Sequence, residues 1–520
     1  MHAQPRGGDR DCQGGSPPLG RREFLTRTGL AGATLVALRG GPAAGAPAGG
    51  TYHVAPDGND AHDGSASAPW RTLRYAARQA QPGDVVKVKA GVYRQTEIIT
   101  RCHGTAERPI VFEADGGTVT IDGGRTVTGW RDEGEGRWSA AIGNDPALVV
   151  WVDGQQLLGP HYWHLSEVRP TAATLPRRTC VIEEGRLHLR LGDGGDPNER
   201  EVRVAVAHCL LLQNTRHTVW RGIGTAWGLN GYKLERESTY NLFTDAELCY
   251  HAQGVLETAE YREYGPSRAN TFQRLHIHHV GLTKFEHGIY TDGVETRIQN
   301  CRFESISGAA IHAYPRPLRG VYDGNVMTDP ARTWAPEHFR GDDPPDPTGH
   351  YTAIICWGRG EHRVTNNLIA GPFGDGINVR APDCKLVNNT IVLERGPAIF
   401  LATSGNRVVN NILKTAGLYV VSEAAVDLDH NAFSGGRAWR IEGRSYSMAA
   451  ELRDAGYERQ GIEAAPQFRD AAAGDYRLAP GSPLRDAGTD VGAPDHDLAG
   501  NPRPQGSGID LGAYEHPPGE

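Results

Sequence analysis

The amino-acid sequence predicts an all-β chain wound as a parallel β-helix, a solenoid whose short strands stack coil upon coil. Two repeats with a shared period of about 22 residues indicate this fold. The segments VTNNLI, LVNNTI and VVNNIL carry the first repeat, at Asn367, Asn389 and Asn411. The second repeat is formed by Ile289, Ile311, Ile354, Ile377 and Ile399, where the longest gap contains one coil plus an insertion. These segments are β-branched and alternating, without a helical period.

Stacking of the coils explains why both repeats recur along the sequence. One coil cannot bury its apolar face alone, whereas neighbouring coils align their inward Ile residues into a continuous core. Equivalent residues should lie about 4.8 Å apart, the distance between paired strands. Asn in a repeated turn should hydrogen-bond to the coils above and below and satisfy backbone groups at the bend. In the earlier segments IQNCRF and YDGNVM, Cys301 and Asn325 occupy the position that Asn367 holds in its repeat.

The first residues form a separate element. Arg21 and Arg22 precede the mild apolar run TGLAGATLVAL, which ends near the small-residue stretch GGPAAGAPAGG. A positively charged N-terminal region, a short apolar region and a cleavage region of small residues are typical of a signal peptide. The paired Arg followed by Phe-Leu resembles the twin-arginine type of signal. We therefore expect residues 1–49 to be removed and the protein to be secreted, extracellular or periplasmic.

The mature chain is predicted to consist of four units. The expected units are an N-terminal cap with a helix and the first coils (50–130), a β-rich inserted region (131–215), the main coils with a loop insertion at 329–351 (216–433), and a C-terminal coil and cap (434–520). The five Pro residues of DPARTWAPEHFRGDDPPDPTGHY should stiffen the loop insertion, so that Trp334, His350 and Tyr351 could wall a groove.

Composition limits the partners. Among 520 residues the net charge is −8, and no long basic run occurs, which argues against nucleic acid and anionic membrane. The seven cysteines after Cys12 contain no CxxC spacing, so a zinc ribbon is not expected. His276, His278 and His279 alternate along one strand, so at most two could share a metal, and we predict no metal site. The oligomeric state is left open.

Alternation along the strands predicts two outward columns. If Ile289 points inward, the first column is Tyr290, His312, Ile355, Asn378 and Phe400. The second column is Asp292, Tyr314, Trp357, Arg380 and Ala402. A water-facing strand rarely holds so many aromatic and hydrogen-bonding groups together, whereas a groove for an extended glycan requires them. Packing beneath the insertion or against a second copy is the alternative interpretation.

The flanking segments carry a resemblance to a known family. The stretch YHVAPDGNDAHDGSASAPWRTLRYAARQAQPGDVVKVKAGVYR (52–94), RPIVFEADGGTVTIDGG (108–124) and the closing residues 481–515 resemble secreted right-handed parallel β-helix carbohydrate-active enzymes of the pectate-lyase-like superfamily. Another stretch, HGIYTDGVETRIQNCRF (287–303), is similar to the β-xylosidase type of glycoside hydrolase within this superfamily. That resemblance implies that Asp292 is the nucleophile, while the position of the acid/base Glu falls on Tyr314.

The sequence favours a glycoside hydrolase that acts on a polysaccharide or oligosaccharide. Tyr314 is a poor acid near neutral pH, so a second carboxyl group would come from Asp375, Asp323, Glu257 or the insertion. Tyr290, Trp357, Asn378, Arg380, Trp334 and His350 would bind substrate, and no cofactor is expected.

Two alternatives remain open. A polysaccharide lyase would use Arg380 or Asn378 to neutralise a uronate, with His312, Tyr290 or Tyr314 as base and acid and with Asp292 as a ligand of a bound Ca²⁺. A non-catalytic glycan-binding protein would use the same aromatic side chains.

Overall fold

The structure is a computed structural model that describes residues 49–94, 96–162, 170–258, 265–328, 330 and 351–517. The predicted signal, except its last residue, and all of the loop insertion but residues 330 and 351 lie outside these ranges. None of the helices in the described ranges is long and apolar enough to cross a bilayer.

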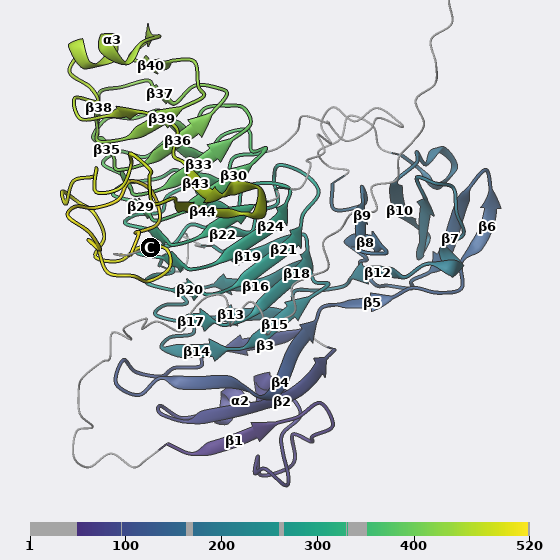
Figure 1. Cartoon of the computed structure of the whole chain (residues 1–520). Helices are drawn as coiled ribbons and strands as arrows, with labels where there is room; N and C mark the ends of the chain where they lie inside the picture. Colours follow the sequence, from purple (N-terminus) through teal and green to yellow (C-terminus); the bar gives the residue numbers. More distant parts are fainter. Residues whose placement is uncertain are drawn as a thin grey trace, which may run out of the picture.

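The chain winds into a parallel β-helix, as the two repeats predict (Figure 1). One coil comprises β23 (Arg297–Gln299), β24 (Arg302–Ile306) and β25 (Ile311–Ala313), and the next comprises β26 (Val321–Asp323), β27 (Val326–Thr328) and β28 (Ile354–Cys356). Each strand pairs in parallel with its equivalent one coil further on, β23 with β26, β24 with β27 and β25 with β28. The molecule therefore has three rows of strands.

The bounds of the other strands follow the same order. The first row also contains β1 (Thr51–Val54), β2 (Val85–Tyr93), β14 (Thr218–Arg221), β17 (Leu242–Thr244), β20 (Thr271–Gln273), β29 (Arg363–Thr365), β32 (Lys385–Val387), β35 (Asn406–Val409) and β38 (Val426–Asp429). The long strands β2 and β4 (Ile110–Asp122) run through both the first and the second row, and β4 pairs with β14 in the first and with β15 in the second. The second row continues with β15 (Ile223–Ala226), β18 (Glu247–His251), β21 (His276–Val280), β30 (Leu368–Gly371), β33 (Thr390–Leu393), β36 (Ile412–Thr415), β39 (Ala432–Ser434) and β42 (Ile462–Glu463). The third row contains β3 (Glu97–Thr100), β13 (Leu210–Gln213), β16 (Asn230–Glu235), β19 (Gln253–Glu257), β22 (Ile289–Thr291), β31 (Ile377–Val379), β34 (Ile399–Leu401), β37 (Val420–Ser422), β40 (Trp439–Ile441) and β41 (Arg444–Tyr446).

The repeated Ile residues form the core of the third row. Ile289 pairs with Ile311, Ile311 with Ile354, Ile354 with Ile377, and Ile377 with Ile399, and each side chain is fully buried. The hydrophobic effect of this continuous column stabilises the stack, because each added coil covers the open face of the one before it. The predicted role of the Ile repeat is confirmed.

The Asn repeat forms a buried ladder of amides. Asn367 donates its backbone N–H and its side-chain Nδ2 to Asn389 Oδ1, at 3.0 and 2.9 Å, and Asn389 donates in the same way to Asn411. Cys301 begins the ladder, and its Sγ lies 3.5 Å from the carbonyl oxygens of Phe272 and Gln299, in the position of an amide nitrogen. The predicted pairing between coils is confirmed, including the equivalence of Cys301 with Asn.

Both ends of the core are closed. Helix α2 (Leu73–Gln79) lies beside the first coil, begins at Thr72, whose hydroxyl accepts a hydrogen bond from the N–H of Tyr75, and buries Leu73 and Ala76. At the far end lies helix α3 (Ala449–Asp454), whose Leu452 is fully buried. The capping helix that the sequence predicts is therefore present.

An antiparallel region with its own core stands to one side of the solenoid (Figure 1). It consists of β5 (Gly124–Thr126), β6 (Arg131–Gly134), β7 (Arg137–Ala141), β8 (Val149–Val152), β9 (Gln155–Leu157), β10 (Thr179–Glu183), β11 (Arg186–Arg190), β12 (Val202–Ala205) and the short helices η1 (Ala172–Thr174) and η2 (Pro197–Glu199). It contacts the coils through Trp151, which meets the ring of Trp227 at 5.5 Å, and through Tyr162, which packs on Leu282.

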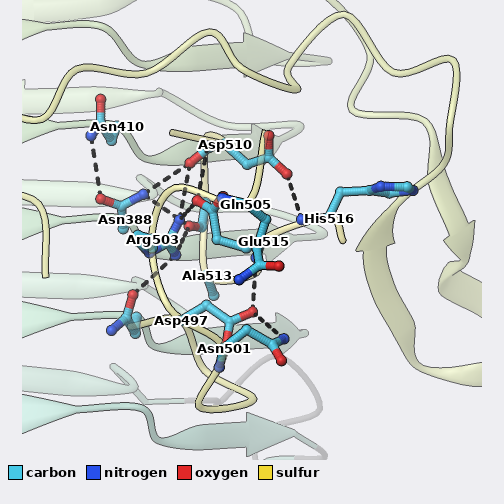
Figure 2. A network of polar contacts seen from close by, with 12 residues as sticks. Asn388, Asn410, Asp497, Asn501, Arg503, Gln505, Asp510, Ala513, Glu515 and His516 are labelled. Atoms are coloured by element: carbon cyan, nitrogen blue, oxygen red, sulfur yellow. Dashed lines mark hydrogen bonds and ion pairs between the residues drawn. The ribbon is translucent and has the colours of Figure 1, made fainter. Parts of the chain in front are cut away.

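The C-terminal segment runs back along the outside of the coils after β43 (Phe468–Asp470), η4 (Ala471–Ala473) and β44 (Asp475–Leu478). Its centre is Arg503, whose side chain is fully buried and contacts the carboxylate of Glu515 (Figure 2). Arg503 also donates to the carbonyl oxygen of Gly512 at 2.9 Å, and Asn388 of the coils donates to the carbonyl oxygen of Asp510 at 3.0 Å. This buried network joins the segment to the solenoid.

Candidate active site

A cavity of about 190 Å³ opens on the third row of strands. It is lined by His312, Tyr314, Tyr351, Thr352, Ile355, Trp357, Asn378 and Arg380. Strands β25, β28 and β31 supply one side chain each, and the residue directly after each strand supplies another. The register places these equivalent positions of successive coils side by side. Five of the predicted site residues, together with Tyr351 of the insertion, therefore meet in one cavity.

The first outward column has the predicted register. Tyr290 pairs with His312, His312 with Ile355, Ile355 with Asn378, and Asn378 with Phe400. Ile355 is nevertheless only 4% exposed, because the neighbouring aromatic and polar side chains cover it. The column contributes a floor to the cavity as well as hydrogen-bonding groups.

The second outward column contributes aromatic rings and one guanidinium to the wall of the cavity. The ring of Tyr314 meets the edge of Trp357 at 5.1 Å and lies 5.5 Å from the ring of His312. The guanidinium of Arg380 lies over Trp357 at 5.4 Å and over Phe400 at 5.1 Å. Such cation–π contacts hold an exposed Arg in place while its N–H groups stay available to an anionic ligand.

Asn378 presents an unused acceptor at the cavity. Its Nδ2 donates to Asp375 Oδ2 at 3.1 Å, whereas its buried Oδ1 has no hydrogen-bond partner among the described residues. A buried carbonyl oxygen without a donor costs free energy, so the site is suited to a ligand that brings a hydroxyl group.

A chain of two histidines fixes the protonation of His312. The backbone N–H of Ala309 donates to His287 Nδ1 at 3.0 Å, so the proton of neutral His287 is on Nε2. His287 Nε2 lies 2.9 Å from His312 Nδ1 and donates to it, which leaves the proton of His312 on its own Nε2. Burial lowers the pKa of His312 to about 4 and that of His287 well below its usual value. At neutral pH His312 therefore offers an N–H donor rather than a basic lone pair.

Asp375 is the carboxyl group beside the cavity. Its Oδ2 accepts hydrogen bonds from Asn378 Nδ2 and from the hydroxyl of Thr352 at 3.4 Å. Burial raises the pKa of Asp375, and these two hydrogen bonds and the charge of Arg380 oppose that rise only in part. Asp375 lies next to the predicted substrate-binding residues but is not one of the residues that line the cavity.

Asp292 directly follows β22, as Tyr314 follows β25, but it does not line the cavity. It is 4% exposed. Its Oδ1 accepts a hydrogen bond of 2.8 Å from the backbone N–H of Arg316, and its Oδ2 lies 3.7 Å from the guanidinium of that residue. Asp292 is absent from the lining of the cavity, as is Tyr290, whose pKa is raised by burial and by the nearby Asp292 charge.

Asp292 and Asp375 do not form a catalytic pair. Asp292 follows β22, whereas Asp375 precedes β31, three coils further along the stack. Three coil spacings of about 4.8 Å amount to about 14 Å along the axis, and the two residues also lie at opposite ends of their strands. The carboxyl groups of glycosidases are about 5 to 9.5 Å apart, so a second carboxyl group for Asp292 would come from elsewhere.

Two other carboxyl groups considered in the sequence have structural partners. Glu257 is fully buried, accepts hydrogen bonds from Asn270, Thr291 and Thr296, and has a pKa raised by burial. Asp323 lies on β26 and is joined to His496 of the C-terminal segment by a contact of 3.1 Å. Neither is placed to act as the acid of the cavity.

The sequence did not predict some residues at the site, and some of the residues that it did predict lie outside the described ranges. His287 and Thr352 lie outside the repeated strand positions, so alternation gives no signal for them, although both contact residues of the cavity. Trp334 and His350, predicted to bind substrate, and the acidic residues of the insertion lie outside the described residues.

Comparisons with known proteins agree with the fold. Residues 264–433 match the family model described as the right handed beta helix region. The structure of XylC in complex with xylose is 14% identical, aligns over 90% of this chain and 99% of that chain, and gives a TM-score of 0.52. Pectate lyase Pel9A is 15% identical, with 91% of this chain and 98% of that chain covered and a TM-score of 0.49.

A curated relative matches only a short stretch. The uncharacterized protein YwoF of Bacillus subtilis (strain 168) is 35% identical over 60 residues, which are 12% of this chain and 13% of that protein. The family-model match and the parallel sheets together show a right-handed parallel β-helix, so the predicted fold class and handedness are confirmed.

Proposed function

We propose that this chain is a carbohydrate-active enzyme that cleaves a uronate-containing polysaccharide or oligosaccharide by β-elimination in the cavity of the third row. The observation that carries the proposal is the lining of that cavity, which combines Arg380, Asn378, Tyr314 and the N–H donor of His312. No carboxylate belongs to this lining among the described residues, which favours elimination over the hydrolysis that the sequence favoured. The fold shared with the structure of XylC with xylose supports a sugar substrate.

The reaction can be written with the groups present. A base removes the proton on the carbon next to the uronate carboxylate, and the carboxylate takes up the resulting negative charge. The bond from the neighbouring carbon to the glycosidic oxygen then breaks, the leaving oxygen receives a proton, and a carbon–carbon double bond forms in the sugar ring. One proton is removed and one is supplied, so no oxidant or reductant is required.

Each role has a candidate in the cavity. Arg380 pairs with the uronate and stabilises its developing charge, since its guanidinium matches a carboxylate bidentately. Asn378 accepts a sugar hydroxyl on its free Oδ1, and His312 donates its Nε2–H to the carboxylate or the leaving oxygen. Tyr314, as its phenolate, is the candidate for proton abstraction, because the lone pair of His312 is on Nδ1 and already accepts the hydrogen bond from His287. Charge neutralisation by Arg380 needs no bound Ca²⁺, and we include no cofactor.

Hydrolysis is the second candidate, and Asp375 supports it. Its pKa is raised by burial, as that of a general acid in a glycosidase must be. Since Asp292 lies three coils away, the partner carboxyl group would have to come from another part of the chain.

The two reactions differ in their products. Purified protein from residue 50 onward would be incubated with neutral and uronate-bearing polysaccharides, and both new reducing ends and the ultraviolet absorbance of the unsaturated product would be followed. Elimination predicts that both signals rise together, and that Arg380→Ala and Tyr314→Phe reduce the rate at least 100-fold. Tyr240→Phe is the matched control, because Tyr240 is exposed and stacks on His217 away from the cavity.

Other outcomes would contradict the proposal. Reducing ends without absorbance, lost in Asp375→Asn, would establish hydrolysis. Glycan binding measured by calorimetry without either product would establish a binding protein. We also propose export through residues 1–49, which Arg21→Lys with Arg22→Lys should block when secretion of the full-length chain is measured.

A further inference from the structure

Three side chains of types that bind metal ions lie together on a different face from the candidate active site. Glu247 on β18 and His276 and His278 on β21 project from the second row, where β18 and β21 pair in parallel (Figure 1). His276 and His278 are two residues apart on one strand, so their side chains share the outer face. Glu247 pairs with His276 in the register, which brings the carboxylate between the two rings.

The distances among these three side chains suit a small cation. One ligand atom from each residue lies within 4.8 Å of the other two. Glu247 Oε1 lies 3.2 Å from His278 Nε2 and 3.9 Å from His276 Nδ1. Metal–ligand bonds of about 2.0–2.2 Å in a tetrahedral site place ligand atoms about 3.3–3.5 Å apart, so small side-chain movements would complete the geometry.

The outer nitrogens of both rings are held as metal ligands require. His276 Nε2 lies 2.7 Å from Glu304 Oε2 on β24, and Arg302 in turn donates to Glu304 at 2.8 Å. With its proton donated to Glu304, His276 turns the lone pair of Nδ1 toward Glu247. His278 Nδ1 lies 2.7 Å from His279 Nδ1, which leaves its Nε2 directed at the same carboxylate. A carboxylate behind a ligating His fixes the ring and raises its basicity.

We propose that Glu247, His276 and His278 bind one divalent first-row transition-metal ion, with Zn²⁺ as the best fit, and with the fourth position left to water. Two imidazoles and one carboxylate are a common protein ligand set for zinc. The competing arrangement is a protonated His276 that bridges Glu247 and Glu304 without any ion. The sequence predicts no metal here because alternation shows the two histidines but gives no indication that Glu247 of the preceding coil lies beside them.

The test uses the tag-free chain from residue 50 onward after treatment with a chelator. Calorimetric titration with ZnCl₂ should show one ion per chain, and Co²⁺ should give the visible absorption bands of a tetrahedral site. His276→Ala and His278→Ala should each weaken binding at least 100-fold, and Glu304→Gln by about 10–100-fold. His430→Ala is the matched control, because His430 lies on a later coil beside Asp429 and should leave the affinity unchanged.

Glu247→Gln guards against a folding defect, since Glu247 is exposed at the surface and the change keeps its shape. A correctly folded Glu247→Gln protein that binds Zn²⁺ as tightly as the parent would overturn the proposal. So would the absence of any stoichiometric binding to the parent chain. Because the readout is metal affinity, the result is independent of the activity proposed for the cavity.

Discussion

Replacement of Asn389 by Ala tests the amide ladder most directly. The side chain is fully buried, and its Oδ1 accepts hydrogen bonds from the backbone N–H and the Nδ2 of Asn367, at 3.0 and 2.9 Å. Its Nδ2 donates to the carbonyl oxygen of Val364 at 2.8 Å and to Asn411 Oδ1 at 2.9 Å. Ala removes these four interactions and a longer one of 3.4 Å to the carbonyl oxygen of Val387, and it leaves a methyl group in a space shaped for an amide.

The expected loss of stability follows from the groups that stay behind. Asn367 keeps one acceptor for its Nδ2, the carbonyl oxygen of Tyr322, but its fully buried backbone N–H loses its acceptor. Asn411 keeps the backbone N–H of residue 389 as a donor, whereas the carbonyl of Val364 loses one. At about 1–3 kcal/mol for each unsatisfied buried group, we expect the free energy of unfolding to fall by about 4 kcal/mol.

Urea-induced unfolding followed by circular dichroism would measure this difference. Lys385→Ala is the control, because Lys385 is exposed on β32, on the same coil, and should change stability by less than about 0.5 kcal/mol. A loss below about 1 kcal/mol for Asn389→Ala, with an unchanged dependence on urea, would refute the reasoning. It would mean that the ladder is replaced by water or by relaxed backbone contacts.

Three further predictions concern other buried groups. Burial raises the pKa of Glu458 from 4.5 to about 8, so the folded chain binds that proton more tightly than the unfolded chain does. The free energy of unfolding should therefore fall as the pH rises from about 4.5 to 8. Glu458→Gln should remove this part of the pH dependence, measured by thermal unfolding. Arg503→Ala leaves Glu515 buried without its cation, and we expect a loss of about 3–5 kcal/mol together with faster proteolysis of the C-terminal segment. The seven cysteines of the described residues are free thiols and all but Cys249 are buried, so a reductant should leave the melting temperature unchanged, and a thiol reagent should modify no more than Cys249 in the folded protein.

The fold was predictable because its determinants repeat along the chain. A parallel stack requires an inward apolar residue and a turn amide in every coil, and both occur at the same period in the sequence. The slot held by Cys301 was predictable for the same reason, although only the structure shows that its sulfur takes the place of an amide nitrogen between two carbonyl oxygens. Periodicity therefore gives the position of each residue in the coil.

The candidate site was predictable only where its residues occupy repeated positions. His312 and Asn378 within their strands, and Trp357 directly after β28, follow from alternation and meet as expected. Alternation gives no signal that Asp292, which holds the equivalent position after β22, stays outside the lining of the cavity. It also gives no account of His287, which lies before its strand and contacts the neighbouring coil through hydrogen bonds with Ala309 and His312.

The position of the carboxyl groups connects the fold with the proposed chemistry. Glu458 ends the amide ladder by accepting the backbone N–H and the Nδ2 of Asn431. Glu257 ends a second, shorter ladder, in which Asn241 donates its backbone N–H and its Nδ2 to Asn270 Oδ1 and Asn270 donates its Nδ2 to Glu257. An amide that accepts from one coil and donates to the next needs an acceptor at the last coil, and a carboxyl group supplies it. Glu257 closes its ladder at β19, on the same row as the cavity but pointing into the core. Stacking uses this acid internally, and Asp292 is held by Arg316 outside the lining of the cavity. The polar groups that line the described cavity are therefore phenols, an imidazole, an amide, a hydroxyl and a guanidinium, and the proposal of β-elimination rests on this set.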